Sequence, residues 1–85
     1  MYTIVISESA LKQLHKMQNS FVKKIQKTID KLAKEPRPPG VKKLKGTIED
    51  LYRIRVGDYR MVYVIDDIIR LVDIRKIGHR KDIYR

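Results

Sequence analysis

The sequence predicts a single α+β domain, residues 1–85, in which an N-terminal strand and an antiparallel helix hairpin precede a small antiparallel sheet. Three observations support this class. The chain begins with a β-branched run, continues with apolar residues at helical spacing, and beyond residue 50 alternates apolar and polar residues in runs separated by short turns. The length is sufficient for one hydrophobic core.

The first elements follow directly from local residue types. Residues 2–6 are rich in β-branched side chains and predict a strand. Ser7 or Ser9 can accept a hydrogen bond from the first turn of a helix and so cap it. The apolar side chains of this helix fall on one side, at Ala10, Leu11, Leu14 and Met17.

A second helix follows the pair Asn19-Ser20, which we expect to break the first helix and cap the next. Its apolar residues recur at helical spacing, at Val22, Ile25, Ile29, Leu32 and Ala33. The helix must end before Pro36, because the residue before a proline disfavours helical conformation. The short break between the two helices predicts an antiparallel hairpin.

The outer side of the second helix carries a row of lysines, at Lys23, Lys27, Lys31 and Lys34. Such a row is typical of a solvated helix face. Contact with RNA or with an acidic partner is the alternative interpretation.

The remaining elements are a connector and a sheet. The prolines of EPRPPG, residues 35–40, exclude helix and ladder and predict a stiff connector, and VKKLKG, residues 41–46, predicts an extended basic segment. Strands are predicted at residues 51–56, 59–65 and 68–77, with two-residue turns at residues 57–58 and 66–67.

These turns fix a register for the sheet. They place Arg55 opposite Arg60, and Arg60 opposite Asp73. One face then gathers Arg53, Arg55, Arg60, Val62, Leu71, Asp73 and Arg75. The other face gathers Tyr52, Ile54, Val56, Tyr59, Met61, Tyr63, Ile65, Val72 and Ile74. We expect the helices to cover the apolar face and to leave the arginine-rich face open.

Like charges directly opposite one another destabilise a sheet, so the crowded arginines need an explanation. An ion pair between Arg60 and Asp73 would satisfy only one guanidinium. The chain also has a formal net charge of +10, from 20 Lys and Arg against 10 Asp and Glu, and most arginines follow Leu51. Lysines that merely keep the protein soluble are the alternative. Arginine grips phosphate with two hydrogen bonds, so the pattern favours a polyanionic partner.

Other composition features exclude some functions. The chain has no cysteine and only two histidines, without an acidic cluster at ligand spacing, so neither a metal nor another cofactor is expected. The N-terminus lacks a signal-peptide pattern and no run is long enough to span a membrane, which favours a cytoplasmic protein without a membrane partner.

The C-terminal sequence KIGHRKDIYR adds candidates for chemistry. We expect Gly78 to break the last strand and to present His79 and Arg80 beside the arginine-rich face. A histidine at a strand end is usually just solvent-exposed, but near this face its ordinary pKa suits proton transfer. Tyr84 lies next to the terminus, where an aromatic side chain gains little from packing and can stack on a base.

Several motifs in order match one known family. The N-terminal strand and helix hairpin are followed by KKLKG, LYRIRVGDYRMVYV and IGHRKDIYR. With these features the chain resembles the RelE/ParE superfamily of toxins from type II toxin–antitoxin pairs, in its RelE branch. The resemblance covers nearly the whole chain.

The resemblance implies a metal-independent endoribonuclease that cleaves messenger RNA, typically in the decoding site of a translating ribosome. The RNA supplies its own 2′-hydroxyl nucleophile, and the products are a 2′,3′-cyclic phosphate and a 5′-hydroxyl. The implied catalytic residues are Arg53, Arg55, Arg60, His79, Arg80 and Tyr84. Further RNA contacts are expected from Lys43, Lys45, Arg75 and Lys81. Family members often have lysines at positions 53 and 55, and since arginine does not exchange protons, the general base stays open.

By the same resemblance, the expected partners are a RelB-like antitoxin in a hetero-oligomer, messenger RNA and the ribosome with its 16S ribosomal RNA. Two other functions remain as alternatives. One is a non-catalytic toxin of the ParE kind that binds DNA gyrase. The other is a small nucleic-acid-binding module, for which the charge alone would suffice.

Overall fold

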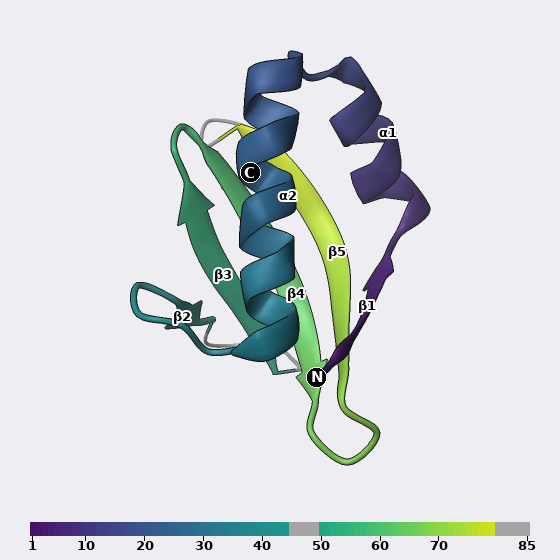
Figure 1. Cartoon of the computed structure of the whole chain (residues 1–85), viewed down its shortest axis with the longest axis vertical. Helices are drawn as coiled ribbons and strands as arrows, with labels where there is room; N and C mark the ends of the chain where they lie inside the picture. The colour runs from purple at the N-terminus through teal and green to yellow at the C-terminus, as the bar shows by residue number, and fades with distance from the viewer. Residues whose placement is uncertain (45–49, 80–85) are drawn as a thin grey trace.

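The computed structural model describes residues 1–44 and 50–79, which form two helices and one five-stranded sheet (Figure 1). Both helices lie on the same face of the sheet. The predicted site residues Lys45, Arg80, Lys81 and Tyr84 lie outside the described residues. Within the described parts of the chain, no helix is long and apolar enough to span a membrane.

The first strand and helix are confirmed. Strand β1 is Thr3–Ile6, and helix α1 is Glu8–Lys16. Ser7, and not Ser9, is the N-cap, because its Oγ accepts the backbone N–H of Ala10 at 3.1 Å. Ala10 is fully buried, but Leu11 is 41% exposed, so its predicted place on the buried side is wrong.

Helix α2 is Asn19–Lys34 and ends before Pro36 as predicted. The expected cap at Asn19-Ser20 is wrong, since both residues already belong to the first turn and the N-cap is Gln18, without a side-chain hydrogen bond. At the other end of the helix, the backbone N–H of Glu35 donates to the carbonyl oxygen of Lys31 at 2.8 Å. Pro36 follows and prevents another helical turn. The helix crosses in front of the sheet (Figure 1).

The strand order is β1-β5-β4-β3-β2, with β2 at Lys42–Lys43, β3 at Leu51–Val56, β4 at Tyr59–Asp66 and β5 at Leu71–His79. Strand β1 pairs in parallel with β5, and the other pairs are antiparallel. The β3–β4 hairpin has the predicted register, with Arg55 opposite Arg60. Its turn begins at Gly57, whose φ of 60° suits glycine.

The predicted register of the last hairpin is wrong. The loop covers residues 67–70, because Asp66 Oδ1 accepts the backbone N–H groups of Ile68 and Ile69 at 3.0 and 3.2 Å and prevents a two-residue turn. A bulge opposite Val62 and Tyr63 adds one more residue. Arg60 therefore lies opposite Gly78, and β5 continues through that glycine instead of breaking there.

The predicted assignment of residues to the two faces of the sheet is nevertheless confirmed for the core. Its buried residues are Ala10, Ile25, Ile29, Leu32, Tyr52, Ile54, Met61, Tyr63, Ile65, Val72, Ile74 and Ile77. The helices contribute the first four of these and the sheet contributes the rest. The observed pairing of β4 with the start of β5 differs from the predicted pairing by an even number of residues. Such a difference leaves each side chain on the face that was predicted for it, so the apolar face is correct although the register is not.

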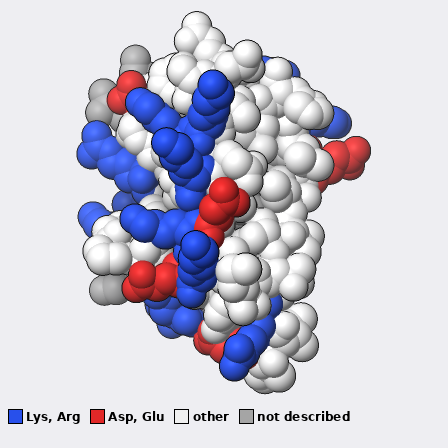
Figure 2. Space-filling model, viewed as in Figure 1, with Lys and Arg blue, Asp and Glu red and all other residues white. Residues whose placement is uncertain are grey.

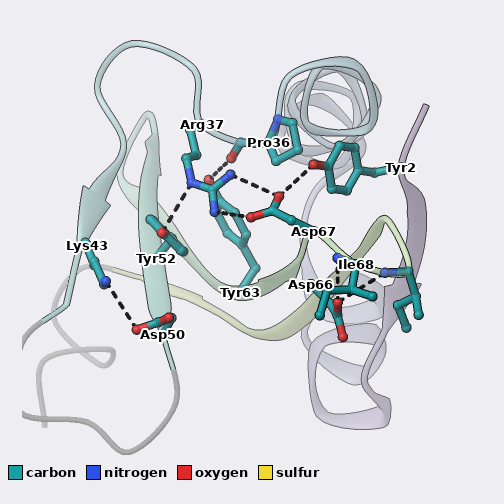
Figure 3. A network of polar contacts seen from close by, with 11 residues as sticks. Tyr2, Pro36, Arg37, Lys43, Asp50, Tyr52, Tyr63, Asp66, Asp67 and Ile68 are labelled. Carbon is teal, nitrogen blue, oxygen red and sulfur yellow. Dashed lines mark hydrogen bonds and ion pairs between the residues drawn. The ribbon is translucent and has the colours of Figure 1, made fainter.

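A polar network holds the proline connector against the sheet (Figure 3). The Arg37 guanidinium donates to both carboxylate oxygens of Asp67 at 3.2 and 2.9 Å, and its Nε donates to the Tyr52 hydroxyl at 3.3 Å. The Tyr2 hydroxyl also donates to Asp67, at 2.6 Å. The hydrogen bonds from Arg37 and then Tyr2 hold the pKa of Asp67 below its ordinary value.

A second contact fixes the start of the same connector. The hydroxyl of the fully buried Tyr63 donates to the backbone carbonyl of Pro36 at 2.8 Å. Burial raises the pKa of the Tyr63 phenol, because the phenolate would lose its hydration there. The connector runs from these anchors to Gly40, which lies at the candidate site.

Candidate functional site

The arginine pair of the β3–β4 hairpin lines a cationic pocket on the sheet face away from the helices. Its volume is about 240 Å³, and we call it the arginine pocket. The residues that line it are Gly40, Lys42, Arg53, Arg55 and Arg60. None of these described lining residues is acidic. The pocket therefore presents four cationic side chains to whatever enters it.

Two of the guanidinium groups are anchored on one backbone oxygen. Arg55 Nε donates to the carbonyl oxygen of Gly57 at 3.1 Å, and Arg60 Nη1 approaches the same oxygen at 3.5 Å. Arg60 Nη1 also donates to the carbonyl oxygen of Tyr59 at 3.2 Å. The turn of the hairpin thus orients both side chains by backbone acceptors, while the other N–H groups of each fork find no acceptor in the described part of the chain and can meet an anion.

The expectation of a fully open arginine-rich face is wrong for one residue. Arg55 is exposed and Arg53 is half-buried, but Arg60 is only 9% exposed. A buried guanidinium in a cationic pocket is costly unless it is hydrogen-bonded and meets an opposite charge. The carbonyl contacts supply the hydrogen bonds, and an anionic ligand would supply the charge.

The predicted ion pair between Arg60 and Asp73 does not form. The shifted register places Asp73 opposite Val64, and Asp73 instead accepts Arg75 Nε at 2.6 Å from its own strand. Arg75 occupies the bulged position of β5, two residues after Asp73. Arg75, predicted to contact RNA, does not line the arginine pocket.

The expectation that His79 lies on the arginine-rich face is also wrong. His79 lies opposite Tyr59, and its ring meets the edge of the Tyr59 ring with centroids 5.7 Å apart. The Tyr59 ring in turn packs against the ring of Phe21 in α2, with centroids 5.2 Å apart. Since neighbouring residues of a strand point to opposite faces, the imidazole shares the helix-covered face and not the face of Arg60.

Sequence reasoning missed two residues of the pocket. Lys42 pairs with Arg53 in the β2–β3 ladder and so shares its face, whereas the predicted Lys43 pairs with Tyr52 and forms an ion pair with Asp50 at 3.2 Å. Alternation along VKKLKG would have found Lys42 if that segment had been paired with β3. Gly40, with φ of 90°, ends the proline connector at the pocket, and no sequence signal gives its position.

Comparisons with known proteins identify the family. Residues 4–84 match the family described as the ParE toxin of type II toxin-antitoxin system, parDE. The chain belongs to the RelE/ParE toxins. As a member of this superfamily, it is 35% identical to the putative toxin RelE1 of Methanocaldococcus jannaschii, over 99% of this chain and 96% of the relative. It is 33% identical to toxin RelG of Mycobacterium tuberculosis, over 99% and 97%.

Solved structures place this RelE/ParE toxin in the RelE-like branch. The archaeal RelE–RelB complex from Pyrococcus horikoshii contains a chain that superposes with a TM-score of 0.84 and 32% identity, over 95% of this chain and 97% of the other. The intact RelBE toxin–antitoxin complex of E. coli gives 0.80 and 27%, over 93% and 96%. The predicted resemblance and fold class are therefore confirmed.

Proposed function

We propose that this RelE-like toxin is an endoribonuclease that cleaves translated messenger RNA, with the ribosomal A site as its place of action. The arginine pocket carries the proposal, since it offers converging cationic side chains, a preorganised guanidinium pair and, among the residues that the structure describes, no acidic lining residue. The names of the relatives, putative toxin RelE1 and toxin RelG, support the same class.

The proposed chemistry needs no nucleophile from the protein. The 2′-oxygen next to the scissile phosphate loses its proton and attacks phosphorus, the bond from phosphorus to the 5′-oxygen breaks, and that oxygen receives a proton. The products are a 2′,3′-cyclic phosphate and a 5′-hydroxyl. Charge grows on the phosphorane oxygens, and donors fixed before the reaction stabilise that charge most effectively.

The roles follow from position. Arg53, Arg55 and Arg60 hold and neutralise the phosphorane, and Lys42 adds a further cation to the same pocket. For Arg80 and Tyr84 the family pattern supplies the proposed roles, charge stabilisation and the orientation or stacking of a base, with Tyr84 a candidate for proton transfer. His79 stays a chemical candidate for proton transfer, but its place beside Tyr59 argues against direct contact with the phosphate.

We also propose a RelB-like antitoxin as the partner in a hetero-oligomer. The solved relatives from Pyrococcus horikoshii and E. coli are toxin–antitoxin complexes. A net charge of +10 suits an acidic or amphipathic segment, because complementary charge speeds association and helps to select the partner.

A non-catalytic toxin that binds DNA gyrase is the second candidate, because the matching family is described by the ParE toxin. Expression in bacteria followed by mapping of the 5′ ends of cleaved messages separates the two. In-frame cuts in translated messages support the nuclease, and a DNA-damage response without such cuts supports the gyrase binder.

The same experiment needs a matched pair of variants. Arg55→Gln removes a pocket cation from an exposed position, and we expect it to abolish the cuts. Arg70→Asn removes one cation from the exposed β4–β5 loop, where asparagine tolerates the φ of 54°, and we expect it to cut like the parent. Equal cutting by both variants would refute the role of the arginine pocket.

A further inference from the structure

A second pocket lies on the helix side of β3, between that strand, α2 and the end of the proline connector. Its volume is about 480 Å³, and we call it the α2 pocket. The residues that line it are Thr28, Lys31, Pro38, Pro39, Gly40, Ile54, Arg55 and Gly57. Gly40 and Arg55 line both this pocket and the arginine pocket. The two pockets therefore adjoin each other.

The edge of the sheet explains how one arginine serves both pockets. Strand β2 pairs only with Tyr52 and Arg53, so within the described chain no strand pairs with the outer edge of β3 at Arg55. The exposed Arg55 side chain passes that edge, with its Nε held by Gly57. A ligand can follow the same path from one face of the sheet to the other.

The α2 pocket combines an apolar floor with cationic sides. Pro38 and Ile54 are buried and, with Pro39, give a surface without hydrogen-bonding side chains. Lys31 and Arg55 stand at its sides, and none of the described lining residues is acidic. Figure 2 shows that Lys and Arg gather over α2 and toward the side of β2 and β3, while the side of α1 and β1 is mostly uncharged.

We propose that the α2 pocket binds the RNA nucleotide adjoining the phosphate in the arginine pocket. The base of this nucleotide packs against Pro38, Pro39 and Ile54. Lys31 and Arg55 hold the phosphate that joins this nucleotide to its neighbour at the arginine pocket. This inference rests on the proposed function and adds a substrate subsite to it. The occupant is an unpaired nucleotide, because single-stranded RNA presents a flat apolar base next to an anion, which is the chemistry of this lining.

The volume agrees with this occupant. Small-molecule pockets in proteins measure roughly 300–1,000 Å³, so the α2 pocket is large enough for a base and sugar, whereas the arginine pocket, at about 240 Å³, suits a phosphate group. The Thr28 hydroxyl, which lines the pocket, donates to the backbone carbonyl of Lys24 at 3.0 Å, so its oxygen can meet a base or ribose only as an acceptor.

The test measures binding and not cleavage. Full-length protein is titrated into a fluorescein-labelled RNA hexamer whose 2′-hydroxyl groups are methylated, so that it cannot be cut, and into a fluorescein-labelled phosphate monoester, which has no nucleotide to place in the α2 pocket. Thr28→Trp fills the pocket, Lys31→Glu reverses one of its charges, and Lys23→Glu makes the same charge change on an exposed part of α2 outside the pocket. Thermal unfolding of each variant verifies that it is folded.

We expect Thr28→Trp and Lys31→Glu to weaken binding of the hexamer about tenfold and to leave binding of the phosphate monoester within about twofold, and we expect Lys31→Glu to lower the salt slope by about 1. Lys23→Glu should bind the hexamer within about threefold of the parent. Hexamer binding unchanged in both pocket variants, or weakened equally by Lys23→Glu, would overturn the subsite.

Two further arms separate the other outcomes. Labelled hexaglutamate serves as an acidic peptide, and if Thr28→Trp weakens its binding as much as that of RNA, the pocket is a general anion or antitoxin site and the inference fails. The 5′-end mapping described above is independent of these titrations. In-frame cuts, together with hexamer binding that neither pocket variant weakens, would reject the subsite alone. Hexamer binding that the pocket variants do weaken, by a protein that makes no cuts, would reject the nuclease alone.

Discussion

Arg55 and Arg60 lie directly opposite each other across the β3–β4 hairpin and donate toward the same carbonyl oxygen of Gly57. Their mutual repulsion destabilises the free hairpin, and the shared acceptor offsets only part of that cost. An arriving phosphate would relieve the repulsion and meet donors that are already oriented. Substitutions of these arginines, and of the residues whose contacts hold the connector in place, test this relationship.

Arg60→Ala should keep the fold and remove growth arrest. The substitution deletes one of two opposed charges and a preorganised donor, so we expect the cleavage rate to fall at least about 100-fold. Circular dichroism and thermal unfolding would verify the fold, and growth after induction would measure toxicity. Arg70→Asn is the control, and full toxicity of Arg60→Ala would defeat the assignment of the arginine pocket.

Tyr84→Ala should likewise fold and lose growth arrest, because the predicted contact with the substrate base depends on its ring. Tyr84→Phe separates the two suggested roles of the side chain. A toxic Phe variant indicates stacking, and an inactive one indicates that the hydroxyl takes part in proton transfer. Toxicity of the Ala variant would remove this residue from the site.

His79→Ala should reduce cleavage only slightly, because the imidazole packs on Tyr59 on the helix-covered face. A general acid or base contributes about 100-fold or more to rate. Cleavage assayed from pH 5 to 9 would show the same profile in variant and parent under our assignment. A loss of about 100-fold, together with a changed pH profile, would restore His79 to the reaction.

Asp67→Asn should lower the free energy of unfolding near neutral pH but not in acid. The hydrogen bonds from Arg37 and Tyr2 depress the folded-state pKa of Asp67, so its contribution to stability is present above the unfolded-state pKa of about 4. That contribution is lost as the pH falls through the folded-state value. Urea unfolding at several pH values would measure the difference, which should shrink in acid.

The control for this experiment is Asp58→Asn, which removes an exposed carboxylate from the β3–β4 turn, outside the network of Figure 3. A stability difference for Asp67→Asn that stays constant from neutral pH into strong acid would contradict the role of its charge.

Tyr63→Phe should destabilise the protein by about 1–3 kcal/mol, since it leaves the buried Pro36 carbonyl without its hydrogen bond. Because burial raises the pKa of Tyr63, the parent should also lose stability as the pH rises above about 10, where the unfolded tyrosine ionises. The Phe variant should lose less. Urea unfolding at neutral and alkaline pH measures both effects, and equal alkaline losses would contradict the second.

The sequence was sufficient to predict the elements formed by local pattern. Apolar spacing placed α2, and the Gly57-Asp58 turn set Arg55 opposite Arg60, because that hairpin depends on two residues with a strong turn preference. The predicted register of the β4–β5 hairpin was wrong because the Asp66 side chain accepts hydrogen bonds from two backbone N–H groups and so lengthens the loop. The alternation of apolar and polar residues along a strand gives no indication of such a contact.

The candidate site, like the fold, could be predicted from the sequence only where it depends on local pattern. The arginines of β3 and β4 followed from alternation, whereas Lys42 required knowledge that a short segment pairs with Arg53. The position of His79 depended on the bulge at Arg75, which changes the face of every later residue of β5. The burial of Arg60 is a product of tertiary packing, to which no sequence pattern pointed.

The parallel pairing of β1 with β5 has a consequence for synthesis of the chain. Thr3 pairs with Leu71, whereas Arg55 pairs with Arg60, so the first contact closes across almost the whole polypeptide and the second across a few residues. Contacts distant in sequence form late and slow the folding of small proteins. We therefore expect a nascent chain to form the β3–β4 hairpin, with its opposed guanidinium groups, before β1 pairs with β5, since that pairing requires both strands to have left the ribosome.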